Sequence, residues 1–453
     1  MLWARWTCTQ ARRLPKEGVA YITGPNTGVH RAMPVSRLKF ESLPHAIFLQ
    51  RVTAHAPATS LEARLGQGAF LALRLVDLLA ADRDPVSSDA FHYQWIATDR
   101  FCRELRAAAT EGAHVHGIAA SASDAHRLND RRMIAPALLA YAHYLEDAMR
   151  LDEALDVLWT LVQVGGAQLS SPDAVAVRLR LARVNRKQNR FDEAEAAYTE
   201  AGVLAAAAGD QYSELLSRIG RANTLLGRGN LAEAERCLQG ILADARAAGQ
   251  RDAEARAEHG IGVALVHMGQ PADAIPHVWR GVELFEDEES RLRALNDIGI
   301  MLLMVGDGVG AERALSEVVR RGATRDNVNN ALIELMHCAS FRGDRVGFAR
   351  WRERCDACVA DMPPNIRADF YLKQGIGQAR FRQFKKAEGL MQQALEIASS
   401  AGLHEFEFRI ERIKNGLRDC ESLLQGEQTA AAEPVFDTAE LREVSASLAQ
   451  LVG

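Results

Sequence analysis

The chain has few lysines, few aromatic residues and no long hydrophobic run. Lysine accounts for seven of its 54 basic residues, and the formal net charge is −5. A charge this mild does not predict a nucleic acid or a membrane surface as partner. No stretch approaches eighteen uninterrupted apolar residues, so we expect no membrane span.

The cysteines do not have the spacing of a known disulfide or metal-binding framework. There are seven of them, an odd number, which together with this spacing favours reduced thiols and a cytoplasmic location. The N-terminus contains Arg5, Arg12 and Arg13 but no apolar core of seven residues, so a secretory signal is not expected.

A six-residue block recurs along the middle of the chain with a period of about forty. The block Asn189–Ala194 returns as Gly229–Ala234 and Gly269–Ala274, and it is preceded by Met149–Ala154. A fixed period of this size indicates stacked two-helix units. Each block ends on a marker alanine, and a small residue about twelve positions earlier lets the two helices approach closely: Ala142, Ala182, Ala222 and Gly262.

These blocks resemble the tetratricopeptide repeat (TPR) family in its longer-period bacterial form. Looser copies follow at Ala311, Phe348 and Ala387, so the resemblance covers roughly residues 131–403, although the family's usual tryptophan is missing. It implies an all-α fold: a right-handed α-solenoid of helix pairs with a helical N-terminal cap and a C-terminal capping helix.

The chain divides accordingly. Residues 1–43, rich in Pro and Gly, are expected to be irregular or disordered, and Met33 is a candidate natural start. Residues 44–130 are a helical cap or degenerate repeats, with 111–129 a loop or weak helix. An array of about seven units at 131–403 precedes a capping helix at 404–424, with Phe406 and Phe408 inward. Residues 425–453 are a linker and a short amphipathic helix.

Several residue pairs have metal-ligand or redox spacing. Cys355 and Cys358 lack a second ligand pair, so they fit small apolar helix positions better than zinc. His114 and His116 fit a surface segment, and His143 with Glu146 fits a polar groove face because no second copy accompanies them. No metal, cofactor or nucleophile signature is therefore predicted, and we expect no enzymatic activity.

Two further patterns have ordinary explanations. Gly-rich pieces at 66–68, 260–262 and 375–377 follow no strand, and the last two coincide with helix-packing positions. A basic patch lies around Trp351, and its acidic neighbours make a solvated face the better interpretation: Arg342, Arg345, Arg350, Arg352 and Arg354.

The family resemblance also implies a concave groove lined by first-helix residues at fixed offsets. In this chain the polar positions are Arg183, Lys187, Asn223, Arg256, His259, His267, Arg293, Asn296, Asn330 and His337. Apolar residues lie between them: Leu139, Ile219, Val263, Ile300, Ile333 and Ile376. Such a groove suits a peptide with acidic groups. A carboxylate clamp is in doubt, because Asn223 matches one site but Gly260 stands where another Asn is needed.

The leading hypothesis is a cytoplasmic, non-enzymatic scaffold or adaptor that binds a protein or peptide segment in this groove. The alternative is a ligand- or peptide-sensing regulator of signalling or transcription, because forty-residue units also resemble the arrays of peptide-pheromone receptors. No helix-turn-helix is evident, so direct DNA binding is not expected.

Overall fold

Helices make up all the regular structure that can be described. The computed structural model describes residues 43–54, 57–80, 87–322, 324–423 and 438–451, and within these ranges there is no strand. The expected all-α class is thereby confirmed. None of the described helices is long and apolar enough to cross a membrane. The segment predicted to be irregular, including Met33, lies outside the described residues except for Leu43.

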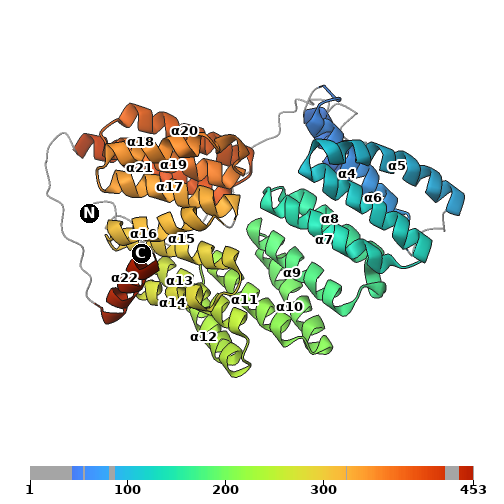
Figure 1. Ribbon diagram of the computed structural model, residues 1–453, viewed down its shortest axis with the longest axis horizontal. Helices are drawn as coiled ribbons and strands as arrows, with labels where there is room; N and C mark the ends of the chain where they lie inside the picture. Colours follow the sequence, from blue (N-terminus) through green and yellow to red (C-terminus); the bar gives the residue numbers. More distant parts are fainter. Residues whose placement is uncertain (1–42, 55–56, 81–86, 323, 424–437, 452–453) are drawn as a thin grey trace, which may run out of the picture. The chain divides into compact units, whose positions relative to one another are not determined.

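The chain forms two compact units that meet in sequence after Gly209. The helices of the N-terminal unit are α3 (Ala46–Ala54), α4 (Leu61–Asp77), α5 (Ser88–Ala108), α6 (Thr110–Leu128), α7 (Ala135–Asp147), α8 (Leu151–Gly165), α9 (Ser171–Lys187) and α10 (Phe191–Ala208), with short 3-10 turns at Arg131–Ile134 and Gly166–Gln168 (Figure 1).

The C-terminal unit begins at Asp210. Its helices are α11 (Gln211–Gly227), α12 (Leu231–Ala247), α13 (Arg251–His267), α14 (Pro271–Leu284), α15 (Glu288–Met304), α16 (Gly308–Arg321), α17 (Arg325–Phe341), α18 (Arg345–Asp356), α19 (Pro364–Arg380), α20 (Phe384–Ser400), α21 (His404–Leu423) and α22 (Ala439–Leu451), with a 3-10 turn at Val359–Asp361.

Successive helices form the predicted pairs. From α7 to α20 each odd-numbered helix packs on the even-numbered helix that follows it. Odd-numbered helices also contact one another, as α7 does α9 and α11 does α13. We call the side formed by the odd-numbered helices the first-helix face. The marker alanines are fully buried between the helices of a pair: Ala154, Ala194, Ala234, Ala274, Ala311 and Ala387.

Close approach explains the small residue of the first helix. A Cβ added to Gly262 in α13 would lie 2.3 Å from Cγ2 of Val278 in α14, far inside van der Waals contact. The equivalent Ala142, Ala182 and Ala222 are buried as well. The small size of these residues therefore sets how near the two helices lie.

A left-handed residue ends the first helix of every repeat. Its φ is positive at Met149, Asn189, Gly229, Gly269, Gly306, Gly343 and Arg382. The amide of the next residue then donates to a carbonyl five residues back, as Asn230 N does to Leu225 O at 2.9 Å. This is the Schellman arrangement, which satisfies helix-end carbonyls and favours Gly or Asn at the turn.

At the edges of the array the structure decides one open expectation and corrects another. Residues 111–129, expected as a loop or weak helix, form α6, whose Gly112 lies against the backbone of Leu105. In α21 Phe406 is half-buried as expected, but Phe408 is 69% exposed, so its predicted inward position is wrong. The helix α21 packs on α19 and α20. These two helices cover only part of its apolar surface, and Phe408 lies outside the covered part.

Candidate functional site

The ten predicted groove residues are divided between the two units. Arg183 and Lys187 lie on α9 in the N-terminal unit, and the other eight lie on α11, α13, α15 and α17 in the C-terminal unit. All ten belong to first helices, as the repeat register requires. Their surroundings differ, and this decides which of them can bind a partner.

On α9, three basic side chains converge on one carboxylate of α7. Glu146, whose side chain is 0% exposed, lies 2.7 Å from Arg180 Nη1, 2.6 Å from Arg183 Nε and 2.8 Å from Lys187 Nζ. The same Nη1 of Arg180 is 2.8 Å from Nδ1 of His143. We call these five residues the Glu146 cluster.

The charges of the Glu146 cluster hold its carboxylate ionised. Burial alone would raise the pKa of Glu146, but attraction and hydrogen bonds from Arg183, Lys187 and Arg180 outweigh it and set the pKa at about 2. Burial in turn lowers the pKa of Lys187, against the attraction of Glu146. With the charge of Asp147, which also acts on Lys187, one positive charge remains in excess. The three basic side chains are 25% exposed for Arg180 and Lys187 and 44% for Arg183.

Two aromatic rings lie near His143, at the edge of the Glu146 cluster. His114 of α6 lies 5.1 Å from the ring of Tyr144 in α7, and both rings are half-buried. Burial is the main cause that lowers the pKa of His114, and together with the charge of His143 it outweighs the attraction of Glu111, which favours the neutral ring at pH 7. The N-terminal unit thus offers excess positive charge beside neutral rings.

In the C-terminal unit, Arg256 is already paired. Its Nε donates to Asp252 Oδ2 at 2.6 Å, and the hydroxyl of Tyr212 donates to the same oxygen at 2.5 Å. The guanidinium also lies 5.8 Å from the ring centroid of Phe285. Arg256 therefore joins neighbouring repeats, and its charge is matched by one carboxylate.

Two other predicted residues of α13 and α15 have internal partners too. His259 Nε2 is 2.8 Å from Asp297 Oδ2, and Arg293 Nη2 donates to Ser290 Oγ at 3.0 Å. Asn296 is only 8% exposed. His267, at the end of α13, is exposed.

The remaining predicted positions are half-buried: Asn223, Asn330 and His337. Burial and then the positive charges of Arg380, Lys373 and Arg409 lower the pKa of His337 well below its ordinary value. Arg380 in turn donates to Ser340 Oγ at 2.8 Å. His337 is accordingly a neutral side chain among basic ones.

A buried ionic network near His337 was not predicted. Lys373 of α19 pairs with Glu334 of α17 and with Asp369, and both Lys373 and Glu334 are less than a tenth exposed. Burial, as the largest cause, raises the pKa of Glu334. The sequence did contain a signal: the acid and the base are 39 positions apart, which is about one repeat.

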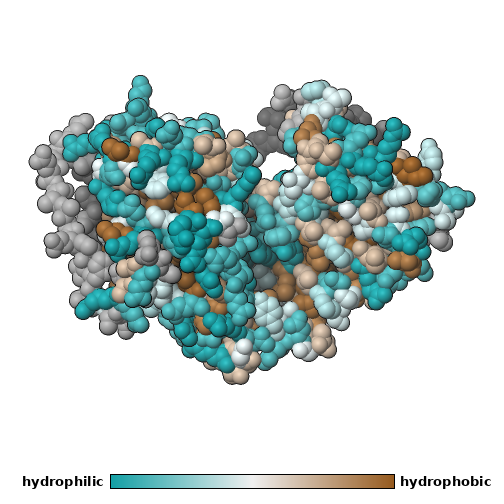
Figure 2. All heavy atoms as spheres, in the orientation of Figure 1, coloured by the Kyte–Doolittle hydropathy of each residue, from teal (hydrophilic) through white to brown (hydrophobic). Residues whose placement is uncertain are grey.

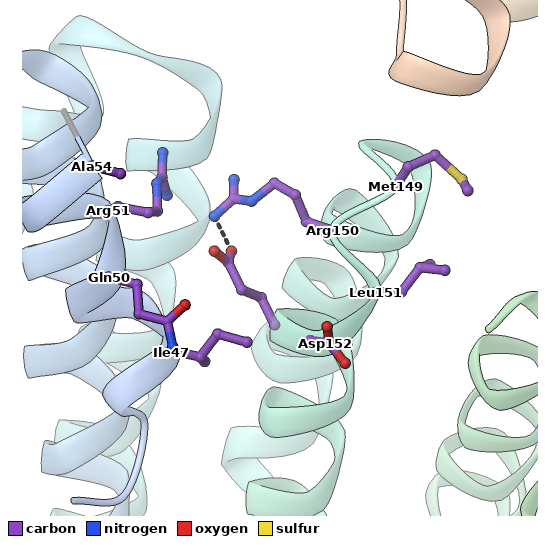
Figure 3. Close-up of a pocket in the computed structure, with 9 residues that line it drawn as sticks. Ile47, Gln50, Arg51, Ala54, Met149, Arg150, Leu151 and Asp152 are labelled. Carbon is purple, nitrogen blue, oxygen red and sulfur yellow. Dashed lines mark hydrogen bonds and ion pairs between the residues drawn. The ribbon is translucent and has the colours of Figure 1, made fainter. Parts of the chain in front are cut away.

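A shallow pocket of about 290 Å³ lies between α3 and the start of α8 (Figure 3). Arg51 and Arg150 point toward one another across it, and both contact Glu111, at 2.7 and 2.8 Å. Tyr141 donates to the same carboxylate at 2.9 Å. The positive charges of this pocket are therefore engaged in joining α3 to α6 and α8.

The pairs with metal-ligand spacing do not converge in the described structure. His116 lies 3.1 Å from Asp99, whereas His114 faces the tyrosines. Cys355 is buried, which raises the pKa of its thiol to about 12, and Cys358 is half-buried. Among the residues described, no three His, Cys, Asp or Glu side chains are grouped so that they could hold a metal ion.

The basic patch around Trp351 is engaged residue by residue. Arg342 pairs with Glu312 and Arg352 with Asp356, while Arg345 lies over the ring of Phe381. Arg350 and Arg354 lie 4.8 and 5.2 Å from the Trp351 ring centroid. These contacts agree with the interpretation of a solvated helix face.

Comparisons with known proteins give matches in fold. No family model matches the chain, and no curated protein matches it in sequence. A Rap protein complexed with Competence and Sporulation Factor is 11% identical over 81% of this chain and 91% of its own, with a TM-score of 0.48. The apo form of the quorum sensor NprR from B. thuringiensis is 14% identical over 84% and 98%, with a TM-score of 0.47.

A third match is a putative kinesin light chain from Podosopora anserina with nearly identical TPR-like repeats. It is 18% identical over 43% of this chain and 98% of its own, with a TM-score of 0.35. At such identities the likeness concerns the fold and not the function. The chain has the paired-helix architecture of TPR-like repeat proteins.

Proposed function

We propose that this chain is a non-enzymatic protein-binding module that captures an acidic segment of a protein or peptide at the Glu146 cluster. The observation that carries the proposal is the gathering of three basic side chains around a single buried carboxylate. The cytoplasmic location expected from the cysteines belongs to the same proposal.

The geometry supports capture of an anionic group. Glu146 engages Nη1 of Arg180 and Nε of Arg183, and a guanidinium has further N–H donors that can meet a second acceptor. The buried carboxylate fixes the three side chains in place before a partner arrives. Preorganised donors of this kind lose less conformational freedom on binding than mobile surface side chains do.

The neighbouring rings indicate the rest of the partner. Tyr144 and neutral His114 offer half-buried aromatic surface beside the charges. Tyrosine is enriched in protein interfaces because it combines a large contact area with little conformational entropy. A segment with an acidic group next to an apolar or aromatic residue fits this combination better than a free inorganic anion.

A matched pair of charge reversals tests the proposal. A library of acidic 12-residue peptides is enriched on the full-length protein, on the Arg183→Glu/Lys187→Glu variant and on the Arg256→Glu/Arg293→Glu variant. Both variants change the net charge equally. We expect the first variant to weaken the selected peptides about 100-fold and the second to leave most of the binding intact. Equal loss in both variants, or no loss in the first, would contradict this site.

A sensing role is the second candidate, and the division of the chain into two compact units favours it. In such a regulator the bound peptide would change how the units are arranged. Small-angle scattering of the full chain with and without a selected peptide tests this: a changed radius of gyration supports a regulator, and an unchanged radius supports an adaptor.

A further inference from the structure

The C-terminal helix α22 covers the outer side of two helix pairs in the C-terminal unit. It contacts α14 and α16, which are second helices of their pairs (Figure 1). Leu441, Val444 and Leu448 are 3%, 3% and 1% exposed and belong to the same core cluster as residues of α14 and α16. The helix that was predicted at the C-terminus therefore docks on the array.

The helix α22 carries its own start signal and a single apolar stripe. Thr438 Oγ1 accepts a hydrogen bond from the amide of Leu441 at 3.3 Å, which is an N-cap. The buried residues follow the spacing i, i+3, i+7, which places them on one side of a helix. Ala446, which lies between Val444 and Leu448, and Ala449, which follows Leu448, are exposed. Among the side chains of α22 that the structure describes, Leu441, Val444 and Leu448 thus provide the buried apolar contact with the array.

The helix α14 has apolar residues beyond those that hold its own pair together. Ala274 and Val278 of α14 meet α13 at Gly262. A second stripe of α14 contains Ile275, Trp279 and Val282, of which Trp279 is half-buried against the core cluster. The helices α15 and α22 are the further neighbours of α14.

The surface of the two units seen in Figure 2 is otherwise mainly hydrophilic, with hydrophobic residues in small groups. If α22 leaves, its apolar contact surface on the array becomes exposed, and exposed apolar patches mark protein-binding sites.

We propose that the outer surface of α14 and α16 is a docking site for an amphipathic helix, which α22 occupies as an internal ligand. The partner it fits is a helix with apolar side chains at i, i+3 and i+7, which takes the place of α22. The helix α22 shows which side chains such a partner needs, because Leu441, Val444 and Leu448 are buried against this surface. This surface is separate from the Glu146 cluster and does not depend on the function proposed there.

The tether sets how strongly α22 competes. A ligand in the same chain has an effective concentration that can reach the millimolar range. A partner helix with the same contacts would therefore bind the intact protein only weakly, and it would bind well once α22 is displaced or altered. The C-terminal helix therefore lowers the apparent affinity of the protein for a partner helix.

Two variants of the full chain separate the site from its internal ligand. Leu441→Asp/Leu448→Asp places charges on the buried side of α22, whereas Ala446→Asp/Ala449→Asp places the same charges on its exposed side. The probe is a fluorescent peptide of residues 438–453, and its anisotropy is measured on each protein. We expect the first variant to bind the peptide at least 10-fold more tightly than either the unchanged protein or the second variant.

Two control peptides test whether the apolar side chains of the peptide cause this binding. A peptide that carries Leu441→Asp/Leu448→Asp should not bind, and a peptide with the three inward residues kept and the outward residues replaced should still bind. Thermal unfolding confirms that both protein variants are folded. Failure of the unchanged peptide to bind the folded first variant overturns the proposal. So does a concentration-dependent dimer of the unchanged protein that the first variant lacks, because the occupant would then be a second copy's helix.

Discussion

The first-helix faces of the two units both carry basic side chains, but their charges are balanced differently. In the N-terminal unit three basic side chains share Glu146, and positive charge is left over. In the C-terminal unit Arg256 has Asp252, His259 has Asp297, and Lys373 has Glu334 and Asp369. The difference shows that a repeat offset identifies where a side chain lies, whereas the adjacent helix decides whether its charge is available.

The largest expected difference between the two units is in the free energy of unfolding that is lost when one lysine is removed from each. Lys373→Met leaves Glu334 buried without its cation, and breaking a buried ion pair in this way costs about 3–5 kcal/mol. Lys187→Met should cost less than about 1 kcal/mol, because Glu146 keeps Arg180 and Arg183. Urea unfolding measures both. Similar losses in the two variants would show that the charges are equally balanced in the two units.

The shared carboxylate itself should matter next most. Glu146→Gln should destabilise the N-terminal unit by about 3 kcal/mol at pH 7, because the pKa of Glu146 is depressed from 4.5 to about 2. A depressed acid stabilises the fold above its unfolded pKa, so this contribution is lost as pH falls from about 4.5 to 2. Acid unfolding followed by circular dichroism measures this. The Glu146→Gln variant should not show the loss of stability between about pH 4.5 and 2.

The control for this variant is Asp147→Asn, one residue away on α7. Its side chain is 54% exposed and lies 3.6 Å from His143. Surface pairs of this kind contribute about 0–1 kcal/mol, so the acid transition should be nearly unchanged.

The histidines should give the two units opposite responses to pH. His45 lies between Asp77 and Asp156, whose hydrogen bonds and charges outweigh its burial and raise its pKa to about 9. Its stabilisation is complete below pH 6.5 and is lost as pH rises through about 9. The pKa of His337 is lowered, so its neutral form favours folding at high pH and this contribution is lost as pH falls below 6.5.

Single replacements by glutamine separate these responses. His45→Gln should remove the alkaline loss from the N-terminal unit, an effect of up to about 3 kcal/mol, and His337→Gln should leave that loss intact. Tryptophan and tyrosine fluorescence of unfolding, recorded from pH 6 to 10, measures both. An alkaline loss that persists in His45→Gln would show that another group is responsible.

Substitutions in the helix-ending turns should change the stability least, and by the same amount in both units. Met149 in the N-terminal unit and Arg382 in the C-terminal unit occupy the left-handed position where four other repeats have glycine. Met149→Gly and Arg382→Gly should each stabilise the protein by up to about 1 kcal/mol, because glycine adopts positive φ without strain. Thermal unfolding measures the gain. Asn189→Gly is the control and should change little, since asparagine tolerates this conformation.

The features that the sequence predicted well are local or repeated. The marker alanines, the small residues opposite them and the helix-ending turns recur at a fixed period, so each copy supports the others. The position of Phe408 was wrong because an isolated amphipathic stripe does not say how much of it a neighbour will cover.

The pairing of the site residues was missed for a different reason. Tyr212 and Asp252 are 40 positions apart, His259 and Asp297 are 38 apart, and Arg180 and Glu146 are 34 apart. Each pair joins neighbouring first helices. Oppositely charged or hydrogen-bonding residues one repeat apart were visible in the sequence, but the side-chain directions that make them meet depend on helix packing.

The contact of Gly262 with Val278 has a consequence for how such arrays can change. A methyl group at position 262 has no room while the branched side chain stays at 278, so Gly262→Ala calls for a compensating Val278→Ala. Chimeras with crossovers inside the α13–α14 hairpin would separate the two partners. Grafts that move the whole hairpin keep them together and are the safer route to rearranged arrays.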